Sequence, residues 1–211
     1  MSPEEGMLAL KELESDRVEG LERRKRLGET VKNVRREFNG IGAEMSQLYE
    51  SSAVYTADEE EPFKLAGETA ADPVLYYQPS TYPGRRLPHV WVNSATPGKK
   101  RSTLDLAGHG GFTLFTGPGG KAWKEAAKAA GNAVRVEIKV ISIGFGQEWE
   151  NSDLEWAQLL GVEESGAILI RPDRVVAWRA KQGLPELATA KLEEVLRSVL
   201  GFSQSLDVLG G

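Results

Sequence analysis

The sequence predicts an α/β fold, and three differences in pattern along its 211 residues support that prediction. Residues 1–52 repeat apolar side chains at helical spacing, whereas residues 53–101 contain six prolines. Residues 102–201 alternate short apolar runs with helical segments in the order β-α-β-α-β-β-α. That order is the one found in thioredoxin-like domains. We therefore expect an N-terminal helical extension, a long proline-rich connection, a thioredoxin-like domain and a tail at residues 202–211.

The helical extension begins with a strong start signal and carries one apolar stripe. Ser2 and Glu5 form a capping box, with Pro3 at the first helical position. Gly40 and Gly42 each cost about 1 kcal/mol relative to alanine in a helix, so we expect a break there. The apolar stripe follows helical spacing and consists of Leu27, Val31, Val34, Phe38, Ile41, Met45 and Leu48. We expect this stripe to be buried in an interface.

The connection at residues 53–101 combines its prolines with the acidic run Asp58–Glu61. Proline lacks a backbone donor and fixes its own φ angle, so long regular elements are disfavoured. We expect a mostly extended segment that is ordered by packing against the rest of the chain.

The first half of the following domain is expected to hold a strand, a helix and a second strand. FTLFT at 112–116 is a short apolar run, and residues 121–130 are rich in alanine and helical in pattern. STLDL at 102–106 is also expected to be a strand. The second strand is predicted from the alternation with charged residues of Val134, Val136, Ile138 and Val140.

The second half is expected to contain a helix, two strands and a last helix. Ser152 and Glu155 form another capping box. AILI at 167–170 is continuously apolar, as in a central strand, and a turn at Pro172-Asp173 leads into VVAW at 175–178. The last helix ends at Gly201 and carries Leu184, Leu187, Leu192, Val195, Leu196 and Val199.

Composition excludes several classes of function. The net charge of -5 and the pI of about 5.3 argue against a nucleic-acid surface. No apolar run approaches the roughly 20 residues of a membrane span, and the N-terminus is acidic where a signal peptide is basic. We therefore expect a cytoplasmic protein. The absence of cysteine excludes disulfides and thiolate chemistry, and two histidines are too few for a His-rich metal site.

Four stretches of the sequence resemble one known family. They are YYQPSTYPGRRLPHVWV (76–92), STLDLAGHGGFTLFTG (102–117), GGKAW (119–123) and SGAILIRPDRVVAWRA (165–180). Together they resemble the C-terminal part of FAD-dependent aromatic hydroxylases of the phenol 2-monooxygenase and 2,4-dichlorophenol 6-monooxygenase type. The resemblance implies a thioredoxin-like C-terminal domain and a link to aromatic-compound metabolism. Residues 38–54 resemble the end of the family's flavin and substrate region.

The sequence departs from that family at one turn. The family carries Asp-Gly at the last β-turn, where this chain has Asp173-Arg174, and Val175 stands where a histidine often follows. We expect these changes at a hairpin tip to affect solubility or contacts and to leave the fold unchanged.

The motif that would bind a flavin dinucleotide is missing. Flavin enzymes of this kind place G-x-G-x-x-G between a strand and a helix, so that backbone N–H groups cradle the pyrophosphate, and this sequence has no such match. We therefore expect no cofactor in the chain alone, and FAD only where a separate flavin domain is present. Because the cofactor carries the chemistry, we expect no monooxygenase activity from the chain alone.

The glycine turn Thr116–Lys121 lies where thioredoxins carry C-x-x-C. Without cysteine it supports no thiol–disulfide exchange, so thiol oxidoreductase activity is not expected either. Two interpretations remain for this turn, a plain tight turn and an anion site at a helix N-terminus.

Four side chains are candidates for acid–base chemistry. His89 and His109 belong to the one side-chain type that titrates near neutral pH, and Tyr82 and Asp105 lie near them in sequence. The alternative interpretation is that each histidine makes a structural hydrogen bond.

Two further side chains are candidates for anion binding. Arg85 and Arg86 could bind a carboxylate or phosphate, or could form anchoring ion pairs within the protein. No metal site is expected from these residue types.

Two functional hypotheses follow. In the first, the chain is a non-catalytic accessory or dimerisation domain that packs on a flavin domain, or on a second copy, through the apolar stripe. In the second, it is a free-standing, cofactor-independent isomerase, dehydratase or cyclase that acts on a phenolic or polyketide-like molecule. The second hypothesis requires His89 and His109 to face one cavity.

Overall fold

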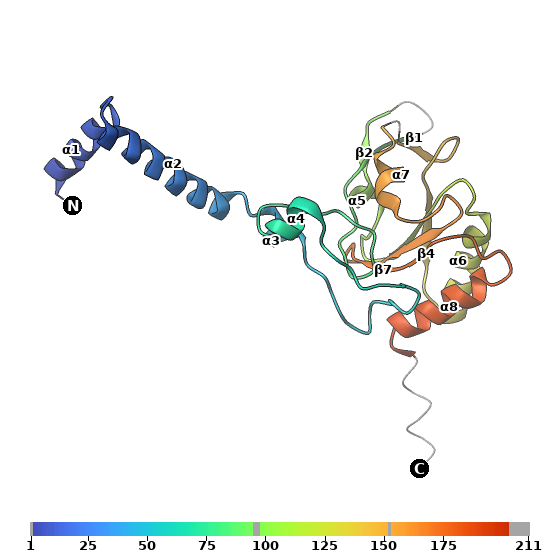
Figure 1. Ribbon diagram of the computed structural model, residues 1–211. Coiled ribbons are helices and arrows are strands. Elements are labelled where there is room, and N and C mark those ends of the chain that lie inside the picture. The colour runs from blue at the N-terminus through green and yellow to red at the C-terminus, as the bar shows by residue number, and fades with distance from the viewer. Residues whose placement is uncertain (1, 95–97, 152, 203–211) are drawn as a thin grey trace, which may run out of the picture. The chain divides into compact units, whose positions relative to one another are not determined.

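The computed structural model describes residues 2–94, 98–151 and 153–202 (Figure 1). It divides into two compact units. A helical unit comprises residues 1–44 and 66–77, and a sheet unit comprises residues 45–65 and the chain from residue 78 onward.

The helical unit is built around a helical hairpin. Helix α1 spans Pro3–Leu13, and its predicted capping box is confirmed by hydrogen bonds between Ser2 and Glu5. Helix α2 spans Val18–Phe38, and Gly20 allows its first turn to approach the chain at Ser15 closely. In the described part of the chain, no helix has the length and apolar character needed to span a membrane.

The predicted helix break is confirmed. Helix α2 ends at Phe38, and a short helix α3 spans Ile41–Met45. Leu48, the last member of the apolar stripe, lies beyond both helices, so its predicted place on the helical stripe was wrong. A Cβ at Gly42 would clash with three main-chain carbonyls of residues 73–76, which explains a glycine at that point.

The sheet unit contains a four-stranded mixed sheet. Its strands are β3 (Phe112–Thr116), β4 (Ile138–Ser142), β6 (Ala167–Ile170) and β7 (Val176–Ala180), in the spatial order β4-β3-β6-β7. Strands β3 and β4 are parallel, whereas β3 with β6 and β6 with β7 are antiparallel. The α/β class is therefore confirmed, as are the strands predicted at FTLFT and AILI.

Helices cover one face of this sheet, and a second layer covers the other (Figure 1). Helices α6 (Lys121–Val134) and α8 (Ala188–Val199) pack on the face that presents Leu114, Leu169 and Trp178. The opposite face presents Phe115, Ile168 and Ile170 and is covered partly by helix α7 (Glu155–Leu160). This alternation along β3 and β6 explains why both strands are continuously apolar in sequence.

A second small sheet and one short helix were not predicted. Strands β1 (Trp91–Ser94), β2 (Arg101–Ser102) and β5 (Trp149–Glu150) form an antiparallel sheet in the order β2-β1-β5. Helix α4 spans Gly67–Ala71. The segment at residues 53–101, predicted as a mostly extended connection, thus contains α4 and β1.

Two local predictions were wrong, and a third involves a residue that is not described. STLDL is not a strand, because Ser102 and Asp105 form a capping box that starts helix α5 (Thr103–Leu106). Val134 belongs to helix α6, which ends at Arg135 in a left-handed conformation (φ 59°), so the predicted strand begins only at Ile138. Helix α7 is preceded by Leu154 as its N-cap, without a side-chain cap, and the predicted cap Ser152 lies outside the described residues.

The conformation of the last β-turn accounts for the glycine that the resemblance implies at position 174. Arg174 has a φ of 68°, which glycine adopts without strain and arginine does not. The Arg174 Nε donates to the Ala107 carbonyl at 3.3 Å, so the side chain makes a contact that glycine lacks. The departure from Asp-Gly therefore combines backbone strain with one added hydrogen bond.

Candidate functional site

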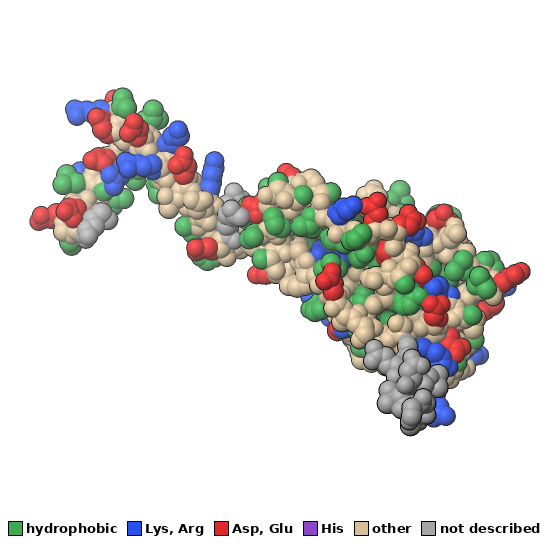
Figure 2. Space-filling model, turned by 60° about the horizontal axis from the view of Figure 1, so that its bottom comes forward, with side chains coloured by type: hydrophobic (Ala, Val, Ile, Leu, Met, Phe, Trp, Pro, Cys, Tyr) green, Lys and Arg blue, Asp and Glu red, His purple; other side chains and the backbone are tan. Residues whose placement is uncertain are grey.

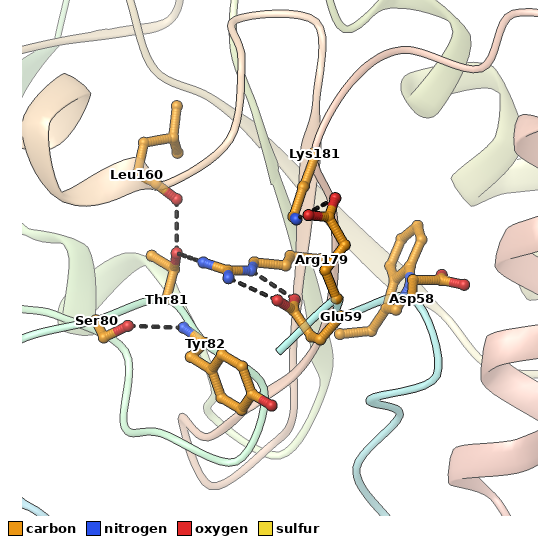
Figure 3. Close-up of polar contacts among 10 residues, drawn as sticks. Asp58, Glu59, Ser80, Thr81, Tyr82, Leu160, Arg179 and Lys181 are labelled. Atoms are coloured by element: carbon orange, nitrogen blue, oxygen red, sulfur yellow. Dashed lines mark hydrogen bonds and ion pairs between the residues drawn. The ribbon is translucent and has the colours of Figure 1, made fainter. Parts of the chain in front are cut away.

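The acidic run at residues 58–61 forms a polar network with side chains of strand β7, of the residue that follows it and of helix α8. Figure 3 shows its contacts with Arg179 and Lys181. Asp58 accepts a hydrogen bond from the Trp178 indole at 2.7 Å and pairs with Lys191 at 2.9 Å. Lys181 pairs with Glu60 at 3.0 Å. We call Asp58, Glu59 and Glu60, with their partners Trp178, Arg179, Lys181 and Lys191, the acidic clasp.

The centre of the acidic clasp is a buried, bidentate ion pair. The Nε and Nη2 atoms of Arg179 each donate to one oxygen of Glu59 at 2.7 Å. Only 13% of the Arg179 side chain and 6% of the Glu59 side chain are exposed. The Nη1 atom of Arg179 contacts Thr81 at 3.3 Å, and the Thr81 hydroxyl donates to the Leu160 carbonyl at 2.6 Å. Because these donors have partners inside the protein, the site holds the 58–60 loop onto β7.

Two pKa values are shifted at the edge of the acidic clasp, that of its member Lys191 and that of the neighbouring Tyr55. Burial raises the pKa of the Tyr55 hydroxyl, and its hydrogen bond to Glu194 at 2.5 Å raises it further. Burial alone would lower the pKa of Lys191, but hydrogen bonds to Asp58 and Tyr55 outweigh that effect, so the Lys191 pKa is raised. Both shifts favour the protonated form of the group in the folded protein.

These shifts predict a loss of stability at alkaline pH. A lysine whose pKa is raised on folding contributes stability that is complete below its ordinary pKa of 10.5 and is lost as pH rises through the folded value. Lys191→Met is therefore expected to be less stable than wild type at pH 8, with a difference that shrinks above about pH 10.5. Urea unfolding from pH 8 to pH 11 measures this difference. Tyr55→Phe isolates the hydroxyl's part, and a constant Lys191→Met difference across the range would contradict the assignment.

The clasp adjoins a cavity that contains one of the predicted site residues. A cavity of about 480 Å³ is lined by Tyr82 and by Glu59–Glu61, among others, and by neither histidine. The Tyr82 ring lies 5.5 Å from the Phe63 ring and 5.5 Å from the Arg179 guanidinium carbon. Four glutamates, Glu50 and Glu59–Glu61, lie on its wall and make this cavity unfavourable for anions.

The two predicted anion-binding arginines have different surroundings. Arg85 is buried, donates to the carbonyls of Ser46 and Gln78, and lies over the Phe63 ring at 4.6 Å. Arg86 is exposed and pairs through its backbone with Val175. The guanidinium of Arg85 thus anchors its own chain segment.

The two histidines lie on either side of helix α5. His89 Nδ1 is hydrogen-bonded to the Ser102 hydroxyl at 2.7 Å, and His109 Nε2 is 3.1 Å from the Asp105 carbonyl. The Asp105 carboxylate accepts from the Ser102 amide, which completes the capping box. Both imidazoles are exposed and contact the short helix.

The glycine turn before α6 does not fit a dinucleotide pyrophosphate. A Cβ at Gly117 would clash with the Glu164 carbonyl, and one at Gly120 would clash with the Thr116 side chain. The Gly120 amide already donates to the Gly117 carbonyl at 3.1 Å. These glycines therefore permit close packing of the chain on itself, which favours the interpretation as a tight turn. The described residues also contain no cluster of three or more acidic or histidine side chains suited to a metal ion.

Comparison with known proteins places this chain among parts of larger hydroxylases. Residues 80–202 match the family described as "Aromatic-ring hydroxylase, C-terminal". The chain is 40% identical over 178 residues to a 2,4-dichlorophenol 6-monooxygenase of Cupriavidus pinatubonensis. This alignment covers 84% of this chain and 29% of that protein. It is 39% identical to a phenol 2-monooxygenase of Pseudomonas sp. strain EST1001, covering 82% of this chain and 27% of that protein.

A solved structure agrees with these matches. The flavin-dependent monooxygenase PieE, solved in complex with FAD and substrate, superimposes with a TM-score of 0.81 at 39% identity. The match covers 95% of this chain and 33% of PieE, so the chain spans about a third of the length of these relatives. On this evidence the chain belongs to the aromatic-ring hydroxylase C-terminal family.

Proposed function

We propose that the chain is a non-catalytic accessory domain that docks on the flavin-binding part of an aromatic hydroxylase. The observation that carries this proposal is an exposed apolar surface on the helical unit. Its members are Leu27, Val31, Val34, Phe38 and Ile41, whose exposed fractions run from 43% at Val34 to 81% at Phe38. Several large apolar side chains exposed on one stripe are typical of an interaction site.

The composition of the hairpin supports a protein partner. Figure 2 shows hydrophobic side chains on the surface of the helical unit, interspersed with charged ones. Helix α1 has no buried residue, and Met7 and Leu10 are each 59% exposed. Burying a side chain such as Leu or Phe is worth about 1.5–3 kcal/mol, so a partner that covers several of them gains substantial affinity.

The relatives support the choice of partner. PieE is a flavin-dependent enzyme three times as long as the part that this chain matches, and the glycine turn of this chain does not fit a pyrophosphate. The accessory domain would therefore work with a flavin-binding part, and the phenolic substrates of its relatives would be hydroxylated on that part. A homodimer through the same surface is the alternative assembly.

We further propose a thioredoxin-like fold for the sheet unit. The order β4-β3-β6-β7, with one parallel pair and two antiparallel pairs, supports it, as do the helices α6 and α8 on one face. In this proposal the fold serves as a scaffold, because the chain has no cysteine for redox exchange.

The proposal is tested by mixing the chain with the flavin-binding part of the Cupriavidus 2,4-dichlorophenol 6-monooxygenase, expressed separately. We expect a colourless chain alone and a yellow 1:1 complex in size-exclusion chromatography with light scattering. Val34→Asp and Phe38→Asp together should weaken binding at least about 100-fold, since each tenfold step requires only about 1.4 kcal/mol.

Leu187→Asp is the matched control, because Leu187 is 62% exposed and lies in the sheet unit. It should leave binding unchanged. A chain that binds FAD by itself, or a complex insensitive to the changes at Val34 and Phe38, would contradict the proposal. A chain that already migrates at twice its mass, and dissociates on those changes, would establish the homodimer instead.

A further inference from the structure

A second cavity lies at the carboxyl ends of the two parallel strands. It has a volume of about 400 Å³ and is walled by the β3–α6 turn at Pro118, by Ile143 and Phe145 after β4, and by Trp156 and Leu160 of α7. Small-molecule sites commonly have volumes of 300–1,000 Å³, and α/β sheets commonly bind ligands outside the carboxyl ends of their strands. The cavity is therefore of the size and in the position of a ligand site.

Trp156, one of the residues that line this cavity, has a buried donor without an acceptor among the described residues. Trp156 is 3% exposed, and its indole N–H is buried without a hydrogen-bond partner among the described residues. Its ring packs on Phe115 at 5.4 Å, and its backbone amide donates to Asn151 at 3.0 Å, so the residue is held in place. A buried donor left unsatisfied costs about 1–3 kcal/mol, which an oxygen acceptor from a ligand would recover.

Two large apolar side chains at the rim of the cavity, Phe145 and Leu154, are exposed to solvent although they would be more stable if buried. Phe145 is 93% exposed and stands between Gly144 and Gly146, both with positive φ. Leu154 is 65% exposed and adopts a left-handed backbone (φ 56°), which is strained for a leucine. Strain and exposed apolar surface at one rim are typical of binding sites.

The charges of the cavity select against anions. Glu150 and Glu164 both contribute to its lining. Glu150 accepts a hydrogen bond from the Gly146 amide at 2.9 Å, which fixes one carboxylate beside the Phe145 loop. A carboxylate or phosphate would be repelled here, whereas a neutral ring with a hydroxyl or carbonyl oxygen would not.

We infer that this cavity binds a neutral hydroxylated aromatic molecule, with its oxygen accepting from Trp156 Nε1 and its ring packing against Phe145. Because the Nε1 atom of Trp156 is buried in this structure, the proposed contact requires a local opening beside the indole. The ligand class draws on the proposed function, while the site itself lies in the sheet unit and involves no member of the docking surface. The domain would thus hold an aromatic compound apart from the flavin-binding part.

The test follows the indole N–H signals of the full chain, labelled with nitrogen-15, during titration with phenol. The chain has five tryptophans, and Trp156→Phe identifies the signal of interest. We expect a saturable shift of the Trp156 signal. Benzoate, of similar size but anionic, should bind at least about tenfold more weakly, a factor of ten being about 1.4 kcal/mol. Phe145→Ala should weaken phenol binding by a similar factor, and Leu187→Ala should leave it unchanged.

The inference is overturned by an unsaturated shift, by equal shifts of all five indoles, or by benzoate that binds as well as phenol. It is also overturned if Phe145→Ala binds phenol like wild type. The saturable shift is measured on the wild-type chain, and Trp156→Phe serves only to assign it, so a poorly folded Phe145→Ala variant leaves that measurement intact. Because no flavin-binding part is present, a failure here is separate from a failure of docking.

Discussion

Replacing Glu59 by alanine is expected to lower the free energy of unfolding by about 3–5 kcal/mol. Arg179 would keep its buried position, with 13% of its side chain exposed, but would lose its counter-charge and both Glu59 oxygens, and would keep only the longer contact of Nη1 with Thr81. A buried charge without a partner is costly because it has left water and gained nothing in exchange. The measurement is urea unfolding followed by far-ultraviolet circular dichroism.

Glu61→Ala is the matched control for this prediction. Glu61 belongs to the same acidic run, but its partner Lys64 and the carboxylate itself are each 72% exposed. An exposed pair contributes about 0–1 kcal/mol, so this variant should resemble wild type. If Glu59→Ala and Glu61→Ala lose equal amounts, the acidic clasp does not depend on its buried pair.

Removing both charges separates the buried pair from its packing. Glu59→Leu combined with Arg179→Met leaves no unpaired charge, and buried pairs replaced by apolar residues of similar volume are often neutral in stability. The double variant should therefore recover most of the loss seen in Glu59→Ala. A double variant as unstable as the single one would show that Thr81, the other partner of Arg179, carries the effect.

The acidic clasp shows where sequence reasoning reached its limit. The acidic run and the alternation of Arg179 and Lys181 along one strand are both visible in the sequence. Their pairing spans about 120 residues, and no local period predicts which distant segments meet. The run was therefore assigned to a connection, although its carboxylates attach that connection to β7.

Local sequence patterns predicted the correct element where the pattern used was the one that dominates the local energetics. The apolar runs FTLFT and AILI became central strands because both faces of the sheet are covered. The alternation of Val134 and Val136 is typical of a strand, but helix α6 ends between them, at Arg135. The same apolar residues therefore flank a helix C-terminus. At Ser102 a capping box was present in the sequence, and it identified helix α5 better than the apolar content of STLDL did.

The candidate acid–base residues show that residue type alone does not predict which side chains meet in a site. His89 and His109 were chosen by residue type, and the structure gives each a hydrogen bond at opposite ends of α5. Trp156 was not singled out, because an unsatisfied indole is a property of packing and has no sequence signal. The cavity at the strand ends could be anticipated only from the parallel pair of β3 and β4.

Trp178→Ala is expected to destabilise the protein by about 3–5 kcal/mol. Trp178 is 1% exposed and meets the Trp123 ring edge to face, with centroids 5.4 Å apart. Its truncation would leave a large cavity between the sheet and α6, since Trp123 is held there by its own hydrogen bond to the Ser165 carbonyl. The indole of Trp178 also donates to Asp58, so the same change loosens the acidic clasp.

Two further variants divide this loss into packing and hydrogen bonding. Trp178→Phe keeps most of the buried ring but removes the donor to Asp58, and a hydrogen bond to a charged group is worth about 1.5–3 kcal/mol. Trp91→Ala is the control, because Trp91 is 47% exposed and its truncation leaves no buried cavity. Circular dichroism is the appropriate probe, since each change alters tryptophan fluorescence directly. If Trp91→Ala lowers the free energy of unfolding as much as Trp178→Ala does, the contact between Trp123 and Trp178 is not the main source of core stability. The stability of the sheet unit would then have to come from other contacts, such as the acidic clasp.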